Sequence, residues 1–244
     1  MKRFILRSSA LITSLFLVGS TASIALKQQS VPLPSTILTD NFQSVNTEKR
    51  KLAVILDAGH GGQDGGASGA DGTLEKDLNL QVTLRTATLL KAMGYDVILT
   101  REDDVMLGNG EIGHKKLADL KYRLDLANDT KDALLISIHM NKFPLEYCNG
   151  IQLYYSENHA DSLLFAKELH SLVKGFQQDN EREIKKATSA IYLLDRAQIP
   201  AVLLECGFLS NEKECTLLKD EGYQKALSLL IASAVCAYEQ QLSE

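Results

Sequence analysis

Short apolar runs alternate with longer segments of helical periodicity from residue 51 to the end of this 244-residue chain. Few folds accept such a pattern, because consecutive βα units place their strands side by side and cover them with helices. We therefore predict an α/β fold with a largely parallel sheet. The expected strands are 52–56, 96–99, 134–138, 151–155 and 201–204.

Helical spacing is clearest between the first two expected strands. Apolar residues recur from Leu74 to Met93, and Gly94 follows as a typical C-terminal stop. Two more helices are expected, over about 115–128 and about 160–177. A last helix is expected around 226–238, where the apolar residues fall on one face. The stretch 107–114 contains three glycines and is expected to be a loop.

The first 26 residues have the features of a secretory signal. Basic residues at positions 2, 3 and 7 precede an uncharged stretch, 8–26, whose apolar centre ends in small residues. Cleavage after Ala22 or Ala25 fits this pattern, and retention as an N-terminal membrane anchor is the alternative. Residues 27–50 are polar, contain Pro32 and Pro34, and are expected to form a linker to a catalytic domain over 51–244.

Charge and aromatic content exclude some partners. The chain has 26 basic and 31 acidic residues, which argues against a surface that binds DNA or RNA. Tryptophan is absent and aromatic residues make up 6%, which argues against a lectin that stacks sugars on aromatic rings. The composition fits an α/β enzyme.

The first expected strand runs into the glycine-rich segment 57–66. In open α/β sheets, ligands bind at the carboxyl ends of the strands. The segment is not a phosphate-binding loop, because Ala67 and Ser68 stand where that motif needs Lys and then Ser or Thr. His60 is therefore the residue of interest, although a histidine bound within a turn is the structural alternative.

His139 follows the strand 134–138, so two histidines can meet at one sheet edge. Two neutral imidazoles and one carboxylate, with a fourth position open to water, are a common ligand set of hydrolytic zinc sites. Glu75, at the start of the first helix, is the best third ligand. Its alternative role is to complement the helix dipole. The other histidines, at positions 114, 159 and 170, are expected on the surface.

Glu205 follows the apolar strand 201–204, where a carboxylate needs a partner. Next to a metal it could take a proton from water and give it to a leaving nitrogen. An ion pair with Arg101 or Arg196 is the alternative. Asp57 is expected either to orient a ligand histidine or to cap the following loop.

Five segments of the chain stand out together, in the order 57–62, 75–76, 100–102, 137–141 and 205–211. They resemble the motifs of the zinc-dependent N-acetylmuramoyl-L-alanine amidases of the type-3 catalytic family. The resemblance covers about 51–238 and is greatest to the germination-specific subgroup, which acts on spore cortex. The narrower resemblance rests on the short single-domain build, on the helix start at 74–77, and on 113–116 with Asp119, Leu120 and Arg123.

The resemblance implies a twisted, mostly parallel mixed sheet with helices on both faces. It implies that His60, Glu75 and His139 hold Zn²⁺ and that Glu205 is catalytic. The implied reaction is hydrolysis of the amide between N-acetylmuramic acid and L-alanine of the peptidoglycan stem peptide, before a separate deacetylase leads to muramic-δ-lactam. The implied location is the cell wall or the spore intermembrane space. Asn141 and Arg101 are expected to contact substrate.

Three alternatives stay open at this point: a vegetative cell-wall amidase, a zinc metallopeptidase, and a non-catalytic wall-binding or scaffold domain. Glu205 argues against the last, because such a domain would be expected to lack a group for proton transfer. Any protein partner is left unassigned. The pairing of the four cysteines is also left open: Cys206 and Cys236 lie in apolar segments and are expected to be buried, whereas Cys148 and Cys215 are expected to be exposed. A cysteine hydrolase would need a histidine beside Cys206, which alternates to the opposite face from Glu205.

Overall fold

A computed structural model of the chain describes residues 52–108, 110 and 113–243. The expected signal or anchor (1–26) and linker (27–50) lie outside the described residues. Within the described part, the structure contains no helix with the length and apolar character needed to span a membrane.

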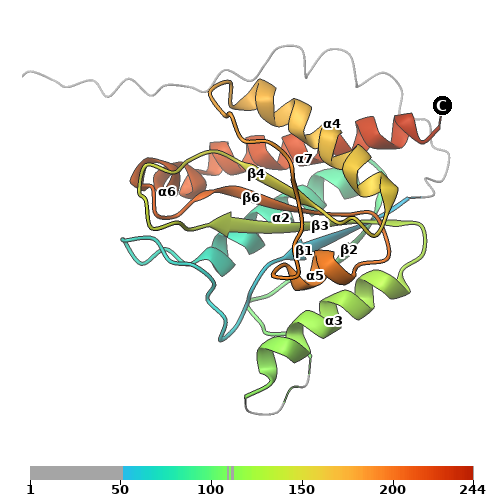
Figure 1. The fold of residues 1–244 in the computed structure, drawn as a ribbon, viewed down its shortest axis with the longest axis horizontal. Helices are drawn as coiled ribbons and strands as arrows, with labels where there is room; N and C mark the ends of the chain where they lie inside the picture. The colour runs from blue at the N-terminus through green and yellow to red at the C-terminus, as the bar shows by residue number, and fades with distance from the viewer. Residues whose placement is uncertain (1–51, 109, 111–112, 244) are drawn as a thin grey trace, which may run out of the picture. The chain divides into compact units, whose positions relative to one another are not determined.

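The described residues build one mixed sheet of six strands in the order β2-β1-β3-β6-β4-β5 (Figure 1). Neighbouring strands are parallel except β4 and β6, which are antiparallel. The strands are β1 (Ala53–Ala58), β2 (Asp96–Leu99), β3 (Ala133–Asn141), β4 (Gln152–Tyr155), β5 (Lys185–Lys186) and β6 (Ala201–Phe208).

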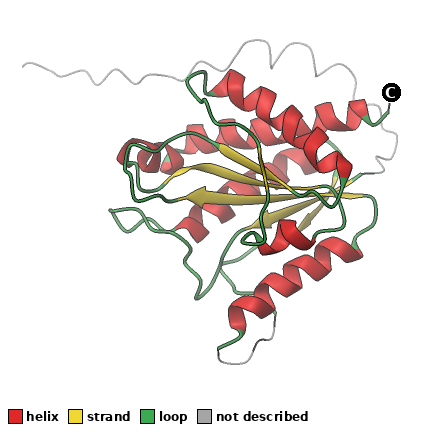
Figure 2. Cartoon of the chain, in the orientation of Figure 1, coloured by secondary structure: helices red, strands yellow, loops and turns green. Residues whose placement is uncertain are grey.

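Helices cover both faces of the sheet, as expected for this fold class (Figure 2). On one face α2, α4 and α7 pack against the larger apolar core, and on the other α3 and α5 pack against the smaller one. Their bounds are α2 (Glu75–Ala92), α3 (Lys115–Asp129), α4 (Ala160–Phe176), α5 (Tyr192–Arg196), α6 (Glu212–Lys219) and α7 (Glu221–Gln241).

The sequence pattern did not predict β5, α5 or α6. It also predicted β3 and β6 to end several residues earlier than they do. β5 has two residues and α5 has five, so neither is long enough to show a periodicity. β3 continues through polar residues to Asn141, because it pairs with β1 on one side and β6 on the other. Its register with β6 shifts between His139 and Asn141, which is a bulge at the end that carries the candidate site.

A buried ion pair ties α3 to the carboxyl end of β1. Arg123 Nη1 lies 2.6 Å from Asp57 Oδ1, and both side chains are 2% exposed. Arg123 also donates to the carbonyls of Ala58 at 2.7 Å and His60 at 2.8 Å. Ser137 Oγ donates to the second oxygen of Asp57. These contacts of Arg123 fix the loop that carries His60 to α3.

Burial raises the pKa of Asp57, but the charge of Arg123 and the Ser137 hydrogen bond outweigh it and lower the pKa to about 2. We predict that Asp57→Asn destabilises the protein by about 2 kcal/mol at pH 7. Because the folded-state pKa lies below that of the unfolded chain, this stabilisation is present above about pH 4 and is lost as the pH falls through about 2.

Urea unfolding of the wild type and Asp57→Asn between pH 7 and pH 2 measures this difference. The gap between the two proteins should close as the pH falls. Asp125→Asn, at an exposed position of α3, is the control and should match the wild type within about 0.5 kcal/mol. A constant gap across the pH range would contradict the assignment.

Candidate metal centre

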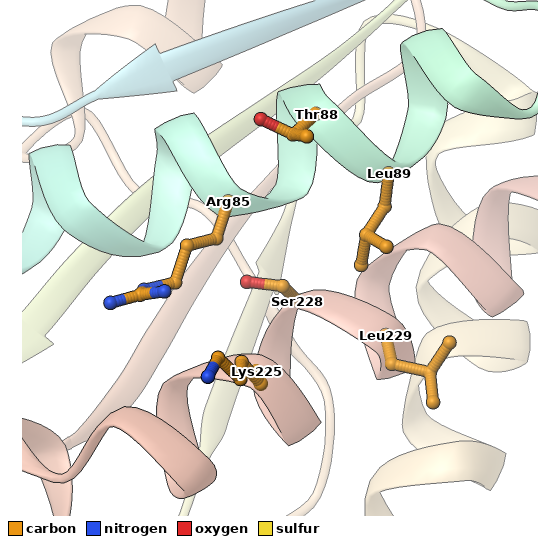
Figure 3. A pocket seen from close by; sticks show the side chains of 6 residues that line it. All are labelled: Arg85, Thr88, Leu89, Lys225, Ser228 and Leu229. Carbon is orange, nitrogen blue, oxygen red and sulfur yellow. The ribbon is translucent and has the colours of Figure 1, made fainter.

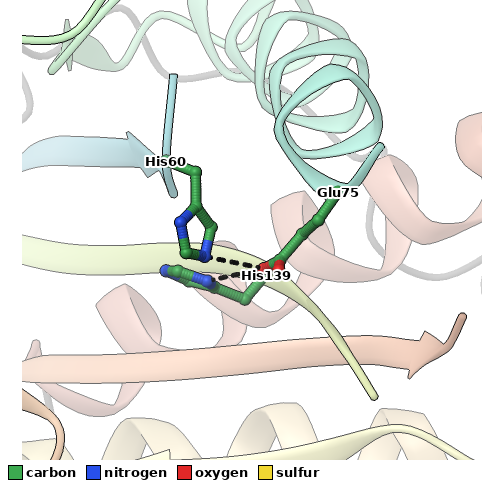
Figure 4. Close-up of side chains that lie close together, drawn as sticks. All are labelled: His60, Glu75 and His139. Atoms are coloured by element: carbon green, nitrogen blue, oxygen red, sulfur yellow. Dashed lines mark hydrogen bonds and ion pairs between the residues drawn. The ribbon is translucent and has the colours of Figure 1, made fainter. Parts of the chain in front are cut away.

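Three side chains from different elements meet at the carboxyl edge of the sheet (Figure 4). His60 follows β1, Glu75 is the first residue of α2, and His139 lies on β3. His60 Nε2 is 3.2 Å from Glu75 Oε1, and His139 Nδ1 is 2.9 Å from the same oxygen. The two imidazole rings are 5.0 Å apart between centroids and nearly perpendicular.

The arrangement fits a zinc ion. One ligand atom from each residue lies within 4.8 Å of the other two. Ligand atoms placed about 2.0–2.1 Å from a tetrahedral Zn²⁺ are about 3.3 Å from one another, close to the nitrogen-to-oxygen distances observed. Among the residues that the structure describes, this is the one group of three or more His, Cys, Asp or Glu side chains with such spacing.

Glycines make room for the cluster. A Cβ on Gly59 would lie 2.2 Å from Cε1 of His139, and a Cβ on Gly66 would lie 2.5 Å from Oε2 of Glu75 and 2.8 Å from Cδ2 of His60. His60 itself has a φ of +62°, a left-handed conformation that is rare for residues other than glycine. The glycine-rich loop therefore serves the close approach of side chains, not of a phosphate.

Glu75 is held in place from several sides. Its Oε2 accepts from the Ala67 amide at 2.7 Å, and its Oε1 also accepts from the Met140 amide at 3.2 Å. Burial raises the pKa of Glu75, but hydrogen bonds with His139 and His60 outweigh it and hold the pKa well below its usual range. Burial lowers the pKa of His60, yet Glu75 and Asp64 raise it overall. The carboxylate is thus anionic and directed at both rings.

Glu205 is paired in register with His139 on the neighbouring strand, so both side chains leave the same face of the sheet. Burial raises its pKa to about 7, with His139 opposing and Glu75 adding to the shift. Its Oε2 is buried and accepts no hydrogen bond from the described residues. The ion-pair alternative is wrong: Arg196 pairs with Asp195, and Arg101 binds main-chain carbonyls.

Arg101 does not have the expected position for a substrate contact. Its side chain is buried, because the residue is 3% exposed. Its nitrogens donate to the carbonyls of Ala58, Gly59, Lys76 and Asp103 at 2.8–3.1 Å. Arg101 therefore joins the β1 loop to the start of α2. Its substrate contact stays a prediction, which this burial does not favour.

Asn141, the last residue of β3, is partly exposed, and its substrate contact stays a prediction. Asp57 makes no hydrogen bond to His60 or His139, because Thr100, Ser137 and Arg123 occupy its oxygens. That contact belongs to Asp64, whose Oδ2 lies 3.0 Å from His60 Nδ1. Asp64 is not among the predicted site residues, although a carboxylate four residues after a candidate ligand is a usable signal.

The remaining histidines lie outside the cluster. His114 is exposed at the start of α3, His159 accepts from the Asp161 amide at the start of α4, and His170 bonds to the Arg182 carbonyl.

All four cysteines are free thiols. Cys206 is buried in the core on the face opposite Glu205, which removes the cysteine-hydrolase alternative. Cys215 is also buried, so its expected exposure was wrong: the start of α6 packs it against the larger core. Cys148 and Cys236 are half-buried.

A groove of about 460 Å³ lies between α2 and α7, and it has no catalytic character (Figure 3). Leu89 and Leu229 supply apolar surface, whereas Arg85 and Lys225 both pair with Glu221. The full lining is Arg85, Thr88, Leu89, Lys225, Ser228 and Leu229.

Comparison with known proteins relates this fold and site to one enzyme family. Residues 54–237 match the family model described as N-acetylmuramoyl-L-alanine amidase. The chain is 36% identical over 188 residues to the germination-specific N-acetylmuramoyl-L-alanine amidase of Bacillus subtilis, covering 76% of this chain and 78% of that protein. It is 29% identical over 187 residues to the N-acetylmuramoyl-L-alanine amidase LytC of the same organism, covering 76% of this chain but 35% of LytC.

A solved structure is similar as well. The CwlD amidase from Clostridioides difficile, solved in complex with the GerS lipoprotein, superposes with a TM-score of 0.74 at 40% identity. The match covers 78% of this chain and 98% of that chain.

The glycine contacts give a direct test of the cluster. We predict that Gly59→Ala weakens zinc binding at least ~10-fold, because the added methyl group forces the His139 ring out of position. Competition with a chromophoric chelator measures the affinity, and circular dichroism checks the fold. Gly175→Ala, a helix position with no atom within 4 Å of the added Cβ, should bind zinc like the wild type. Equal affinity of both variants would refute the proposed crowding.

Proposed function

This chain belongs to the N-acetylmuramoyl-L-alanine amidase family and cleaves peptidoglycan, and we propose that it does so as a zinc enzyme of the spore cortex. The proposed ligands are His60, Glu75 and His139, and the proposed proton-transfer group is Glu205. The observation that carries the proposal is the convergence of two imidazoles on one buried carboxylate oxygen, with Glu205 on the adjacent strand.

The proposed reaction breaks the amide between the lactyl group of N-acetylmuramic acid and L-alanine. A bound zinc ion supplies Lewis-acid chemistry, which polarises a carbonyl and lowers the pKa of water towards ~7. Glu205 accepts a proton from the attacking water as the water oxygen bonds to the carbonyl carbon. As the carbon–nitrogen bond breaks, Glu205 returns that proton to the L-alanine nitrogen, leaving a lactyl carboxyl group and a free amine.

The environment of Glu205 suits both steps. A carboxyl group with a pKa near the working pH is an effective base and an effective acid in turn. Glu205 Oε2 has no hydrogen-bond partner among the described residues, so no such contact on this oxygen competes with proton transfer.

The narrower biological role rests on the relatives. The similarity to the germination-specific amidase of Bacillus subtilis supports cortex peptidoglycan as substrate, with muramic-δ-lactam as the later product of the pathway. The similarity to LytC, an N-acetylmuramoyl-L-alanine amidase whose name specifies no spore role, leaves a vegetative amidase as the second candidate. A general metallopeptidase is disfavoured by the family match.

The proposal extends to location and partner. Export through residues 1–26, cleaved or kept as an anchor, would bring the domain over 51–244 to the cell wall or the spore intermembrane space. The solved complex of CwlD with a lipoprotein supports a protein partner for this chain as well.

Glu205→Ala separates the chemical step from metal binding. We predict that the variant keeps its zinc, because no proposed ligand is removed, but hydrolyses purified peptidoglycan ~10²- to 10⁴-fold more slowly. Mass spectrometry of the released muropeptides gives the rate, and metal analysis of the same sample gives the zinc content. Glu212→Ala, at an exposed position of α6, is the matched control and should retain full activity. Undiminished turnover by Glu205→Ala would remove the assigned role.

The cortex role is testable in a spore-forming host. We predict that the gene restores muramic-δ-lactam to the cortex of a Bacillus subtilis strain that lacks its germination-specific amidase, and that the Glu205→Ala gene does not. Muropeptide analysis of purified spores reads out the result. If the wild-type gene restores no muramic-δ-lactam while the purified enzyme still cleaves vegetative walls, the result counts against the cortex role and favours the vegetative alternative.

A further inference from the structure

We propose that Asp64 is a positioning residue that prepares His60 to bind the metal, and that Lys116 weakens this action by binding the same carboxylate oxygen. The inference rests on the proposed function, because it concerns the affinity of the zinc site. Asp64 lies in the glycine-rich loop and Lys116 lies on α3, so the two come from separate parts of the chain.

The two ring nitrogens of His60 face different groups. Nε2 points to Glu75 Oε1 at 3.2 Å, and Nδ1 points to Asp64 Oδ2 at 3.0 Å. A neutral imidazole carries one proton, so a hydrogen bond from Nδ1 to a carboxylate leaves the lone pair on Nε2. Asp64 thereby selects the tautomer that can coordinate a metal and fixes the plane of the ring.

Asp64 is itself well fixed. Its main chain exchanges two hydrogen bonds with Gly61, at 2.9 and 3.1 Å, which close the turn that follows His60. Its Oδ1 accepts from the Gly66 amide at 3.2 Å. Oδ2 is therefore the oxygen that contacts His60, and a change in its charge or hydrogen bonding alters the hydrogen bond to the imidazole ring.

Lys116 reaches that same oxygen. Its Nζ lies 3.2 Å from Asp64 Oδ2, and its side chain is 66% exposed. The ammonium group competes with the imidazole N–H for one acceptor and lowers the negative charge available to the ring. Lys115, the preceding residue, contacts Gln63 Oε1 at 3.3 Å and not Asp64. Lys115 and Lys116 therefore carry the same charge, but of the two it is Lys116 that contacts the Asp64 carboxylate.

The first experiment measures the zinc dissociation constant of the purified full chain by competition with a chromophoric chelator. Asp64→Asn keeps the shape of the side chain but removes its charge. We expect zinc affinity to fall about 10- to 100-fold. An affinity within twofold of the wild type would overturn the role of Asp64.

The second experiment tests whether removal of the Lys116 charge strengthens zinc binding. Lys116→Met should tighten zinc binding about twofold to fivefold, the size expected from an exposed ion pair. Lys115→Met changes the net charge equally and should leave the affinity unchanged. In the Asp64→Asn background, Lys116→Met should give no gain, because the effect passes through the carboxylate. An equal gain from both lysine variants, or a gain that persists in that background, would overturn the role of Lys116.

Zinc binding by the wild type and by His139→Ala distinguishes a failure of this inference from a failure of the proposed function. If the wild type binds no zinc, or if His139→Ala binds it equally well, the proposed metal site fails. If the wild type binds zinc, His139→Ala does not, and Asp64→Asn binds like the wild type, only the present inference fails. Thermal unfolding of the metal-free proteins checks the fold, and if Asp64→Asn does not fold, the comparison of the two lysine variants decides.

Discussion

Two imidazoles that share one carboxylate oxygen set the geometry of this edge of the sheet. His60 and His139 contact Glu75 Oε1 from different strand ends, and these contacts bring β1, β3 and the start of α2 together. Such an approach leaves no space for side chains in between, so glycines stand at positions 59 and 66. The composition of the loop is therefore a consequence of the cluster.

Buried arginines hold the loops around the cluster by binding main-chain carbonyls. Arg101 and Arg123 both donate to the Ala58 carbonyl, and Arg123 reaches the His60 carbonyl as well. Asp57 balances the charge of Arg123. Loops usually lack a regular hydrogen-bond ladder, and here two guanidinium groups satisfy carbonyls that a ladder would have used. Hydrogen bonds from buried arginines therefore hold the loop at the candidate site. Apolar side chains pack the rest of the sheet against the helices.

The sequence predicted the central strands, the long helices and the close approach of His60, Glu75 and His139, because each depends on a local signal. The roles of these residues and of Glu205 stay proposals. Strand ends carry His60 and His139, and a helix start carries Glu75. What the sequence did not predict concerns interactions between distant segments: the main-chain contacts of Arg101, and the contact of His60 with Asp64 in place of Asp57. Tertiary packing decides which groups hydrogen-bond to a buried arginine or to one ring nitrogen of a histidine. The spacing of apolar residues along the sequence carries no information about these partners. Very short elements such as β5 and α5 leave no pattern to detect.

The alternation of Glu205 and Cys206 along β6 has a consequence for how this edge can change. Glu205 faces the candidate site and Cys206 faces the larger core. A slip of β6 by one position would move the carboxylate into the apolar core and the thiol to the face that carries His139. Such a misalignment costs free energy on both faces at once, so packing of the apolar core fixes the face on which Glu205 lies.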